Sequence, residues 1–263
     1  MAENHLNIIE LDLKIKILKG AIFNLKGKNR NRDFYDYKNL LLSIQDEEIK
    51  HTPIEKEVLE IEGLLFHTLN EYLESGEELH IIRALKWDVD LLISLLKSYN
   101  SLNNSESLIG IELLYKFVNN VNFRICQYPD GIIDNECVIS YISKLINCED
   151  LPFRFTLIGN LLFSIMKLHD VPSKEFCSII ETLSNDDVDQ HLYLAISNSR
   201  GCTWRGCYDG GQQERNIAEK YACLSRKVLP YSYRMKKIFD DLSKSYLLQA
   251  ERMDEEALMN KYR

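Results

Sequence analysis

Apolar residues recur every three or four positions through the middle of this chain. Residues 55–74 follow this spacing with Val58, Ile61, Leu65, Leu69 and Leu73. Such positions share one face of an α-helix, so the pattern predicts a helix with one apolar side. The same pattern predicts further helices over residues 79–99, 105–123, 134–147, 153–168, 173–184 and 187–196.

Turn residues separate these predicted helices. Tyr128-Pro129-Asp130-Gly131 is a strong turn signal, and Pro152 and Pro172 lie in two further connections. Strand signals are few, and residues 11–17 fit a strand and a helix about equally well because β-branched residues alternate there with lysines. The short connections imply that successive helices are antiparallel neighbours.

The C-terminal part of the sequence predicts a helical hairpin. Residues 212–228 and 233–262 both have helical spacing, and Pro230 stands between them. The second of these helices carries charge opposite an apolar stripe. That stripe packs either on the first arm of the hairpin, on the rest of the chain, or on another protein chain.

Together these elements predict an all-α fold, either a multi-helix bundle or a solenoid-like stack that ends in a C-terminal helical hairpin. No repeat consensus supports a named repeat family. We expect two parts, a helical body over residues 1–196 and a loop with the hairpin over residues 197–263.

Charge and cysteine content narrow the class of protein. The chain has 263 residues and a net charge of −8, which divides into +4 over residues 1–32, −14 over residues 33–208 and +2 over residues 209–263. Basic ends on an acidic body suit an acidic or phosphate-rich partner, or are simply a solvated surface. The sequence pI near 5.4 argues against a dedicated nucleic-acid-binding domain.

The first residues, MAENHLNIIELDLKIKIL, include acidic and polar residues where a signal peptide has a basic start and an apolar run, so we expect a cytoplasmic protein. The seven cysteines are scattered through helix-like sequence, which is typical of reduced thiols. No run approaches the roughly 18 apolar residues of a membrane span, so we expect no membrane partner. The sequence carries no nucleotide-binding or cofactor motif, and we expect neither a cofactor nor a metal. In particular, Cys202 and Cys207 supply only half of a zinc site, and a redox-active pair is the other functional interpretation of them.

The strongest candidate site is the glycine- and arginine-rich segment from Ser197 to Arg215, because irregular loops held by helices often carry function. Two glycines precede a predicted helix start, where unpaired N–H groups attract anions, and nearby arginines and a tryptophan add binding groups. The candidate residues are Arg200, Trp204, Arg205, Gly210, Gly211 and Arg215. They bind a phosphorylated ligand, contact a protein partner, or form a tight structural connector.

Two arginines and three aromatic residues lie close together in residues 29–37, a mixture that suits single-stranded nucleic acid. Two arginines are too few for tight binding, so a polar loop leading into an element at residues 37–44 is the default interpretation.

The segments GGQQERNIAEKYACLSRKV and YSYRMKKIFDDLSKSYLLQAERMDEEA resemble a C-terminal helical module of uncharacterised bacterial proteins. Some proteins with that module belong to mobile-element or defence gene clusters. The resemblance implies a bacterial multiprotein system for this chain and covers about 65 residues, residues 197–263. We therefore expect a non-catalytic interaction or adaptor subunit with a protein partner. The alternative is an enzyme or sensor that binds a nucleotide or another phosphorylated ligand at residues 197–215.

Overall fold

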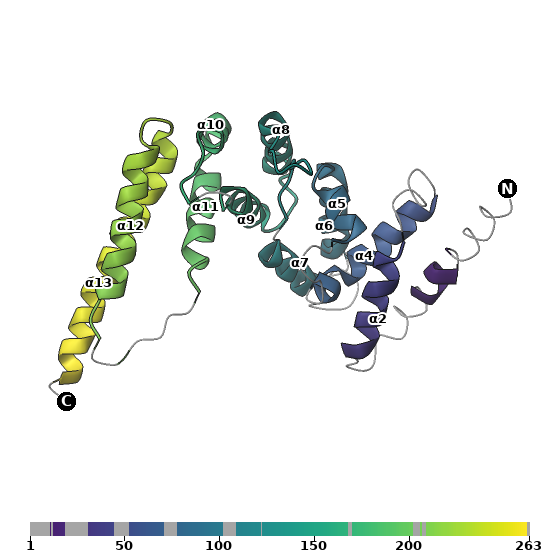
Figure 1. The fold of residues 1–263 in the computed structure, drawn as a ribbon, viewed down its shortest axis with the longest axis horizontal. Helices are drawn as coiled ribbons and strands as arrows, with labels where there is room; N and C mark the ends of the chain where they lie inside the picture. Colours follow the sequence, from purple (N-terminus) through teal and green to yellow (C-terminus); the bar gives the residue numbers. More distant parts are fainter. Residues whose placement is uncertain are drawn as a thin grey trace. The chain divides into compact units, whose positions relative to one another are not determined.

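The computed structural model describes residues 11, 13–18, 31–44, 53–70, 78–101, 109–121, 123–167, 170–201, 206 and 209–261. It divides into two compact units, Met1–Asn120 and Val121–Arg263. The described residues form helices and no strand, which confirms the all-α prediction (Figure 1). None of the described helices is long and apolar enough to span a bilayer.

The first unit contains five bounded helices in the described part of the chain. They are α2 (Asn31–Leu42), α4 (Pro53–Asn70), α5 (His80–Leu85), α6 (Val89–Ser101) and α7 (Ile109–Asn120). Residues 13–18 are also helical, so the strand alternative is wrong there. Helix α2 begins six residues before the element expected from residue 37, and part of the expected polar loop is therefore helical.

One predicted helix is two helices in the structure. The sequence predicts a single helix over residues 79–99, but α5 ends at Leu85 and α6 begins at Val89. The Asp88 carboxylate accepts a hydrogen bond from the Leu91 N–H at 2.9 Å and caps the new helix. The apolar spacing continues across the break without interruption, so the sequence pattern could not reveal that the helix ends there.

A buried polar group joins three segments of the first unit. His80 is 4% exposed, and its Nδ1 lies 2.8 Å from Oε1 of Glu62 while its Nε2 lies 2.9 Å from the carbonyl oxygen of Ile44. The other Glu62 oxygen accepts a hydrogen bond from the Ile81 N–H at 2.6 Å. Burial alone lowers the pKa of His80, but the hydrogen bond and negative charge of Glu62 outweigh it and raise that pKa above 6.5.

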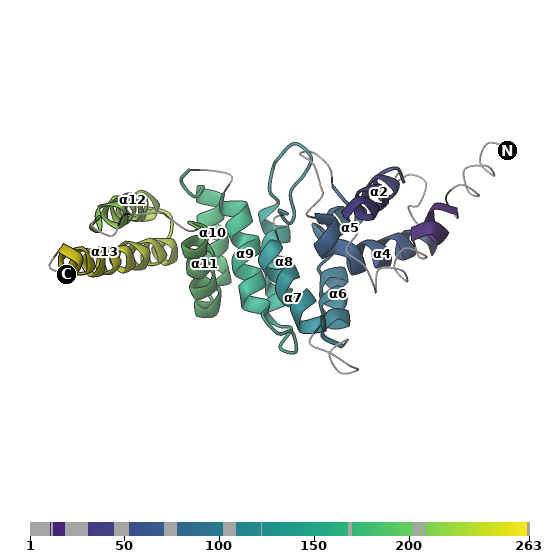
Figure 2. The same cartoon turned by 90° about the horizontal axis from the view of Figure 1, so that it is seen from below.

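The second unit is a succession of helix pairs. They are α8 (Asn135–Ile146) with α9 (Arg154–Met166), α10 (Lys174–Leu183) with α11 (Asp186–Asn198), and α12 (Gln212–Val228) with α13 (Tyr233–Lys261). Helix α10 packs on α8, α11 packs on α9, and α13 packs on α10 and α11 (Figure 2). This is the solenoid-like form of the predicted fold.

Helices α12 and α13 form the predicted hairpin and lie side by side over the length of α12 (Figures 1 and 2). Tyr221 on α12 stacks on two rings of α13, at centroid distances of 6.0 Å to Phe239 and 5.7 Å to Tyr246. The apolar stripe of α13 is buried at Met235, Ile238, Leu242, Tyr246 and Ala257. It packs within this unit, on α12 and on the preceding helix pair.

The division into units differs from the one expected from sequence. The boundary expected near residue 197 lies inside the second unit, because the hairpin is fastened to the helices before it. The guanidinium group of Arg234 on α13 pairs with Asp186 at 2.7 Å and with Asp189 at 2.8 Å, both on α11. The observed boundary falls between Asn120 and Val121, at the end of α7.

Candidate functional site

The described part of residues 197–215 is a structured junction between α11, α12 and α13. Four of the six candidate residues, Arg200, Gly210, Gly211 and Arg215, lie in it, whereas Trp204 and Arg205 lie outside the described residues. Cys202 and Cys207 also lie outside them.

The two glycines allow the start of α12 to approach α13 closely. A Cβ atom on Gly211 would collide with the backbone of Ala250, and one on Gly210 would collide with the carboxylate of Asp254. The Gly211 N–H donates a hydrogen bond to Oδ1 of Asp254 at 2.8 Å. A carboxylate from α13 therefore occupies the place at the N-terminus of α12 where an anion was expected.

Arg215 is paired with the same carboxylate. Its guanidinium group forms an ion pair with Asp254, so that Asp254 bridges the first turn of α12 and the C-terminal half of α13. Hydrogen bonds from Arg215 and from the Gly211 N–H hold the pKa of Asp254 below its ordinary value. Arg215 and Asp254 are each about two-fifths exposed, so the pair lies at the surface.

Arg200 forms a second and more buried contact of the same kind. Its guanidinium group lies 3.0 Å from Oε1 of Glu214, a residue of α12 that is only 4% exposed. It also lies 5.3 Å from the ring centroid of Tyr246 on α13. These contacts join the end of α11 to both arms of the hairpin.

Sequence reasoning identified the cationic and glycine members of this junction but missed Glu214, Tyr246 and Asp254. The local sequence could have indicated Glu214, because an acidic residue in the first turn of a helix stabilises its N-terminus. Asp254 lies 43 residues from its partner Gly211, and the second unit offers many other acids. Nothing in the local sequence distinguishes it.

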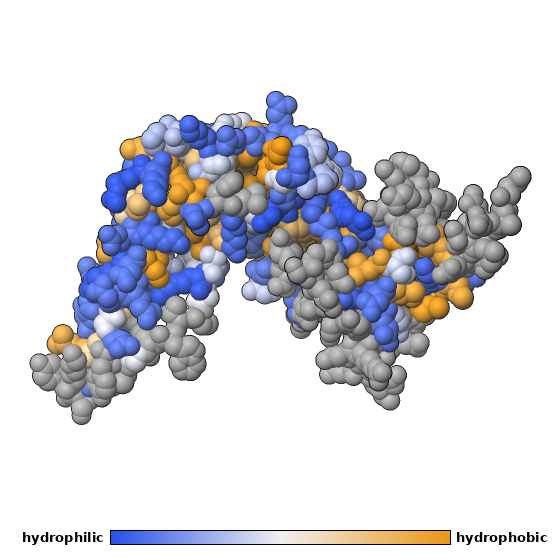
Figure 3. Space-filling model, viewed as in Figure 1, coloured by the Kyte–Doolittle hydropathy of each residue, from blue (hydrophilic) through white to orange (hydrophobic). Residues whose placement is uncertain are grey.

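A second surface feature, the turn of the hairpin, was not singled out by the sequence. Three large side chains are exposed there, namely Leu229 (52%), Tyr231 (45%) and Tyr233 (71%). We call these three residues the turn patch. In the view of Figure 3 the surface of the hairpin is largely hydrophilic, and hydrophobic colour is visible at its turn end and near its C-terminal end.

The backbone beneath the turn patch is held in place by α10 and α11. Oε1 of Glu181 on α10 accepts hydrogen bonds from the Ser232 hydroxyl at 2.7 Å and from the Arg234 N–H at 2.9 Å. Burial opposes ionisation of Glu181, but these hydrogen bonds outweigh it and lower the pKa of the carboxyl. Ser232 caps α13 by accepting a hydrogen bond from the Met235 N–H at 2.9 Å. Exposed side chains on a fixed backbone make a preorganised surface.

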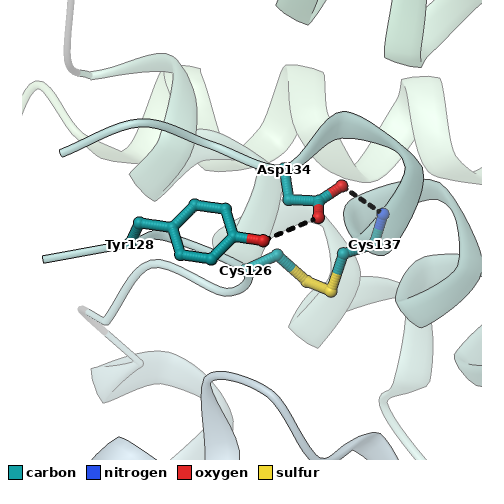
Figure 4. The surroundings of a disulfide bond; sticks show 4 residues. All are labelled: Cys126, Tyr128, Asp134 and Cys137. Atoms are coloured by element: carbon teal, nitrogen blue, oxygen red, sulfur yellow. Dashed lines mark hydrogen bonds between the residues drawn. A yellow bond between two sulfur atoms is a disulfide. The ribbon is translucent and has the colours of Figure 1, made fainter. Parts of the chain in front are cut away.

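A disulfide joins the turn at residues 127–133 to the start of α8. Cys126 and Cys137 are bonded, and the intervening chain folds back through an antiparallel bridge between Gln127 and Ile133. The Asp134 carboxylate accepts hydrogen bonds from the Tyr128 hydroxyl at 3.2 Å and from the Cys137 N–H at 3.0 Å (Figure 4). The predicted turn is confirmed, with Gly131 at φ 89°.

The expectation of reduced thiols is wrong for Cys126 and Cys137, because the turn brings two cysteines 11 residues apart in sequence to a Cα–Cα distance of 5.8 Å. Cys177 and Cys223 are not in disulfides. Burial raises the pKa of the Cys177 thiol to about 11, and Glu181 and Glu175 add to this effect, so Cys177 is not a reactive thiol at neutral pH.

Within the described residues, no three His, Cys, Asp or Glu side chains are grouped as a metal site. Neither a protein-family model, nor a curated protein, nor a solved structure matches the chain.

Proposed function

We propose that this chain is a non-catalytic interaction subunit that docks another protein through the turn of its C-terminal hairpin. The observation that carries the proposal is the turn patch, where Leu229, Tyr231 and Tyr233 project from a backbone fixed by Glu181. Aromatic side chains supply much of the binding energy at the centres of protein interfaces. Their preorganisation reduces the entropy that docking would cost.

The junction around Asp254 supports this proposal as a structural element. Arg200 pairs with Glu214 there, while Arg215 and the Gly211 N–H both bind Asp254. These contacts hold the hairpin in a fixed direction relative to α11. A docking surface on a rigidly held element loses less entropy when a partner binds. The assignment to a bacterial multiprotein system, including anti-phage defence, rests on the sequence resemblance alone.

The sequence favours a cytoplasmic location, whereas the Cys126–Cys137 disulfide favours an oxidising compartment. Binding of nucleic acid at residues 29–37 stays a prediction, and the backbone of residues 31–37 belongs to helix α2.

The test is quantitative affinity capture with the tagged full-length chain from a lysate of its native host. We expect Leu229→Ser to remove a captured protein that the wild-type chain retains, because it deletes an exposed apolar side chain without changing the core. Leu194→Ser is the matched control, because Leu194 is an exposed leucine of α11 in the same unit. Equal capture by wild type and Leu229→Ser would argue against the proposal.

The alternative function, a nucleotide or phosphorylated ligand bound at residues 197–215, has less support from the described contacts. A phosphate at the start of α12 would have to displace Asp254 from both Gly211 and Arg215. Thermal unfolding in the presence of nucleotides and inorganic phosphate tests it, since a ligand at 100 times its dissociation constant stabilises a protein by about 2.7 kcal/mol. We expect no shift. A shift that disappears in Arg205→Ala or Arg215→Ala would favour the ligand function instead.

A further inference from the structure

Helix α13 has an outer face that α12 does not cover and that α11 borders only at its N-terminal end, where Lys237 lies near Asp189. The helix is 29 residues long, and its exposed residues recur with spacings of three, four and seven. We call this the outer face of α13. Its central line consists of Lys237, Lys244, Leu248, Glu251, Glu255 and Leu258, all of which are exposed.

The outer face carries apolar side chains at two places. Leu247 and Leu248 lie at the midpoint of the helix, and Leu258 and Met259 lie near its C-terminal end, with exposed fractions between 45% and 65%. Residues 11 apart lie nearly above one another on an α-helix, so the two pairs share one side. Two exposed apolar pairs on one side of a helix make that side a candidate contact surface when its charges are also complementary to a partner.

The charges on this face differ in sign between its two halves. The central line is basic before the midpoint, at Lys237 and Lys244, and acidic after it, at Glu251 and Glu255. Asp241 and Arg252 lie beside the line with the opposite signs. The ion pair between Lys244 and Asp241 is long, at 3.7 Å, and solvent-exposed, so it contributes little and leaves Lys244 available.

This pattern is self-complementary when the helix is reversed. Lys244 and Glu251 each lie about 5 Å along the helix axis from the point between Leu247 and Leu248. A two-fold axis beside that point would place Lys244 of one copy opposite Glu251 of the other. A parallel arrangement would instead place lysine beside lysine.

We propose that the outer face of α13 is the interface with a second copy of this chain, whose α13 runs antiparallel across a two-fold axis at Leu247 and Leu248. Lys244 of each copy pairs with Glu251 of the other on both sides of the axis. Leu258 and Met259 pack on the alkyl stems of Lys236 and Lys237 of the other copy. A two-fold contact of this kind closes on itself and yields a dimer.

This interface is separate from the docking function proposed above. It uses α13 from Lys236 to Met259 and leaves out the turn patch, and its test does not involve Leu229. A chain that dimerises without docking a partner, or docks without dimerising, would separate the two proposals.

The first experiment measures the mass of the full-length chain by sedimentation equilibrium over about 1–100 μM, a range that covers ordinary dimer affinities. We expect a dimer for the wild type, a monomer for Leu248→Glu, and a dimer for the control Leu194→Glu on α11. A wild-type monomer over the whole range would overturn the proposal, and so would a Leu248→Glu dimer of wild-type affinity. If the wild type is monomeric and a lysate protein binds only when Leu248 is intact, the face belongs to that protein.

The second experiment exchanges charges at exposed positions, where folding is not at risk. Lys244→Glu and Glu251→Lys each place two like-charged pairs in the homodimer, so each should weaken dimerisation roughly tenfold. An equimolar mixture of the two variants should regain wild-type affinity, because in the heterodimer both pairs are again opposite in charge. A mixture no tighter than either variant alone would overturn the antiparallel arrangement.

Discussion

Gly211 is the residue on which the junction of the C-terminal hairpin most depends. The place that a Cβ atom would take on Gly211 is filled by the backbone of Ala250, and the Gly211 N–H donates a hydrogen bond to Asp254. Protein backbone cannot rotate away from an added methyl group as a flexible side chain can. Close approach of α12 to α13 therefore requires glycine at this position.

We predict that Gly211→Ala lowers the free energy of unfolding by about 2 kcal/mol, as expected for overpacking against a fixed neighbour. Urea unfolding followed by circular dichroism measures the change. Gln212→Ala, at the next position, which is exposed, should change the stability by much less. Equal effects of the two substitutions would show that the close approach is not a stability determinant.

His80 gives the first unit a pH-dependent stability. Both ring nitrogens face oxygen atoms, one from Glu62 and one from the backbone of Ile44, so protonation of the ring strengthens both contacts. Because the pKa of His80 is raised above 6.5 in the folded chain, its stabilisation is complete below that pH. It is lost as the pH rises through the folded-state pKa.

We therefore predict that the free energy of unfolding of the first unit decreases as the pH rises from 6 to above the raised pKa of His80. His80→Gln should make this free energy less dependent on pH. Urea unfolding monitored by Trp87 fluorescence, in a chain whose other tryptophan is replaced, reports on this unit. His191→Gln in the second unit is the control. An NMR titration of His80 with a pKa at or below 6.5 would contradict the prediction.

At this scale the sequence anticipated the chemistry of some residues but not their partners. Gly210, Gly211 and Arg215 drew attention because glycines and arginines cluster before a helix. The carboxylate that binds them comes from α13, and its identity depends on the three-dimensional packing of two helices. Glu62 and His80 form a similar pair, because they are 18 residues apart on different helices.

At the scale of elements, the positions of the helices followed from apolar spacing and turn residues. The prediction of a helix over residues 212–228 is confirmed at both ends, and α8 to α11 lie within about two residues of their predicted bounds. The break between α5 and α6 was missed because the apolar positions stay in phase across it. The disulfide was missed because it depends on how the chain reverses at residues 128–131.

We predict that reduction of the Cys126–Cys137 disulfide destabilises the second unit by about 2.5 kcal/mol, because opening a short loop restores entropy to the unfolded chain. The melting temperature measured with and without a dithiol reductant gives the size of the effect. The Cys126→Ser/Cys137→Ser double variant should melt at the temperature of the reduced wild type and should not respond to reductant. A response of the double variant would assign the effect to another cysteine.

At the scale of the whole molecule, the boundary between the two units has no signal in the sequence. The boundary at Asn120/Val121 carries no proline- or glycine-rich linker, whereas the glycine-rich segment near residue 197 lies inside a unit. The sequence thus placed the boundary at a glycine-rich segment, whereas the structure divides the chain at the end of α7. Contacts such as the Arg234 pairs with Asp186 and Asp189 decide the division.

We predict that residues 121–263 fold on their own as a helical unit that unfolds cooperatively, because their core and the hairpin's fastening lie within that range. Circular dichroism and thermal unfolding of this fragment provide the measurement. A fragment ending at residue 196 should be less stable, because it loses the cover that α13 gives to α10 and α11. Equal stability of the two fragments would contradict the observed division.

The most direct test of the docking function is the affinity of the purified chain for the purified protein that it captures. We predict that Leu229→Ser weakens this affinity at least tenfold, about 1.4 kcal/mol of binding free energy, while Leu194→Ser leaves it unchanged. The melting temperatures of both variants should match the wild type, so that a loss of binding is not a loss of folding. Wild-type affinity in Leu229→Ser would contradict the central claim that the turn of the hairpin is the docking surface.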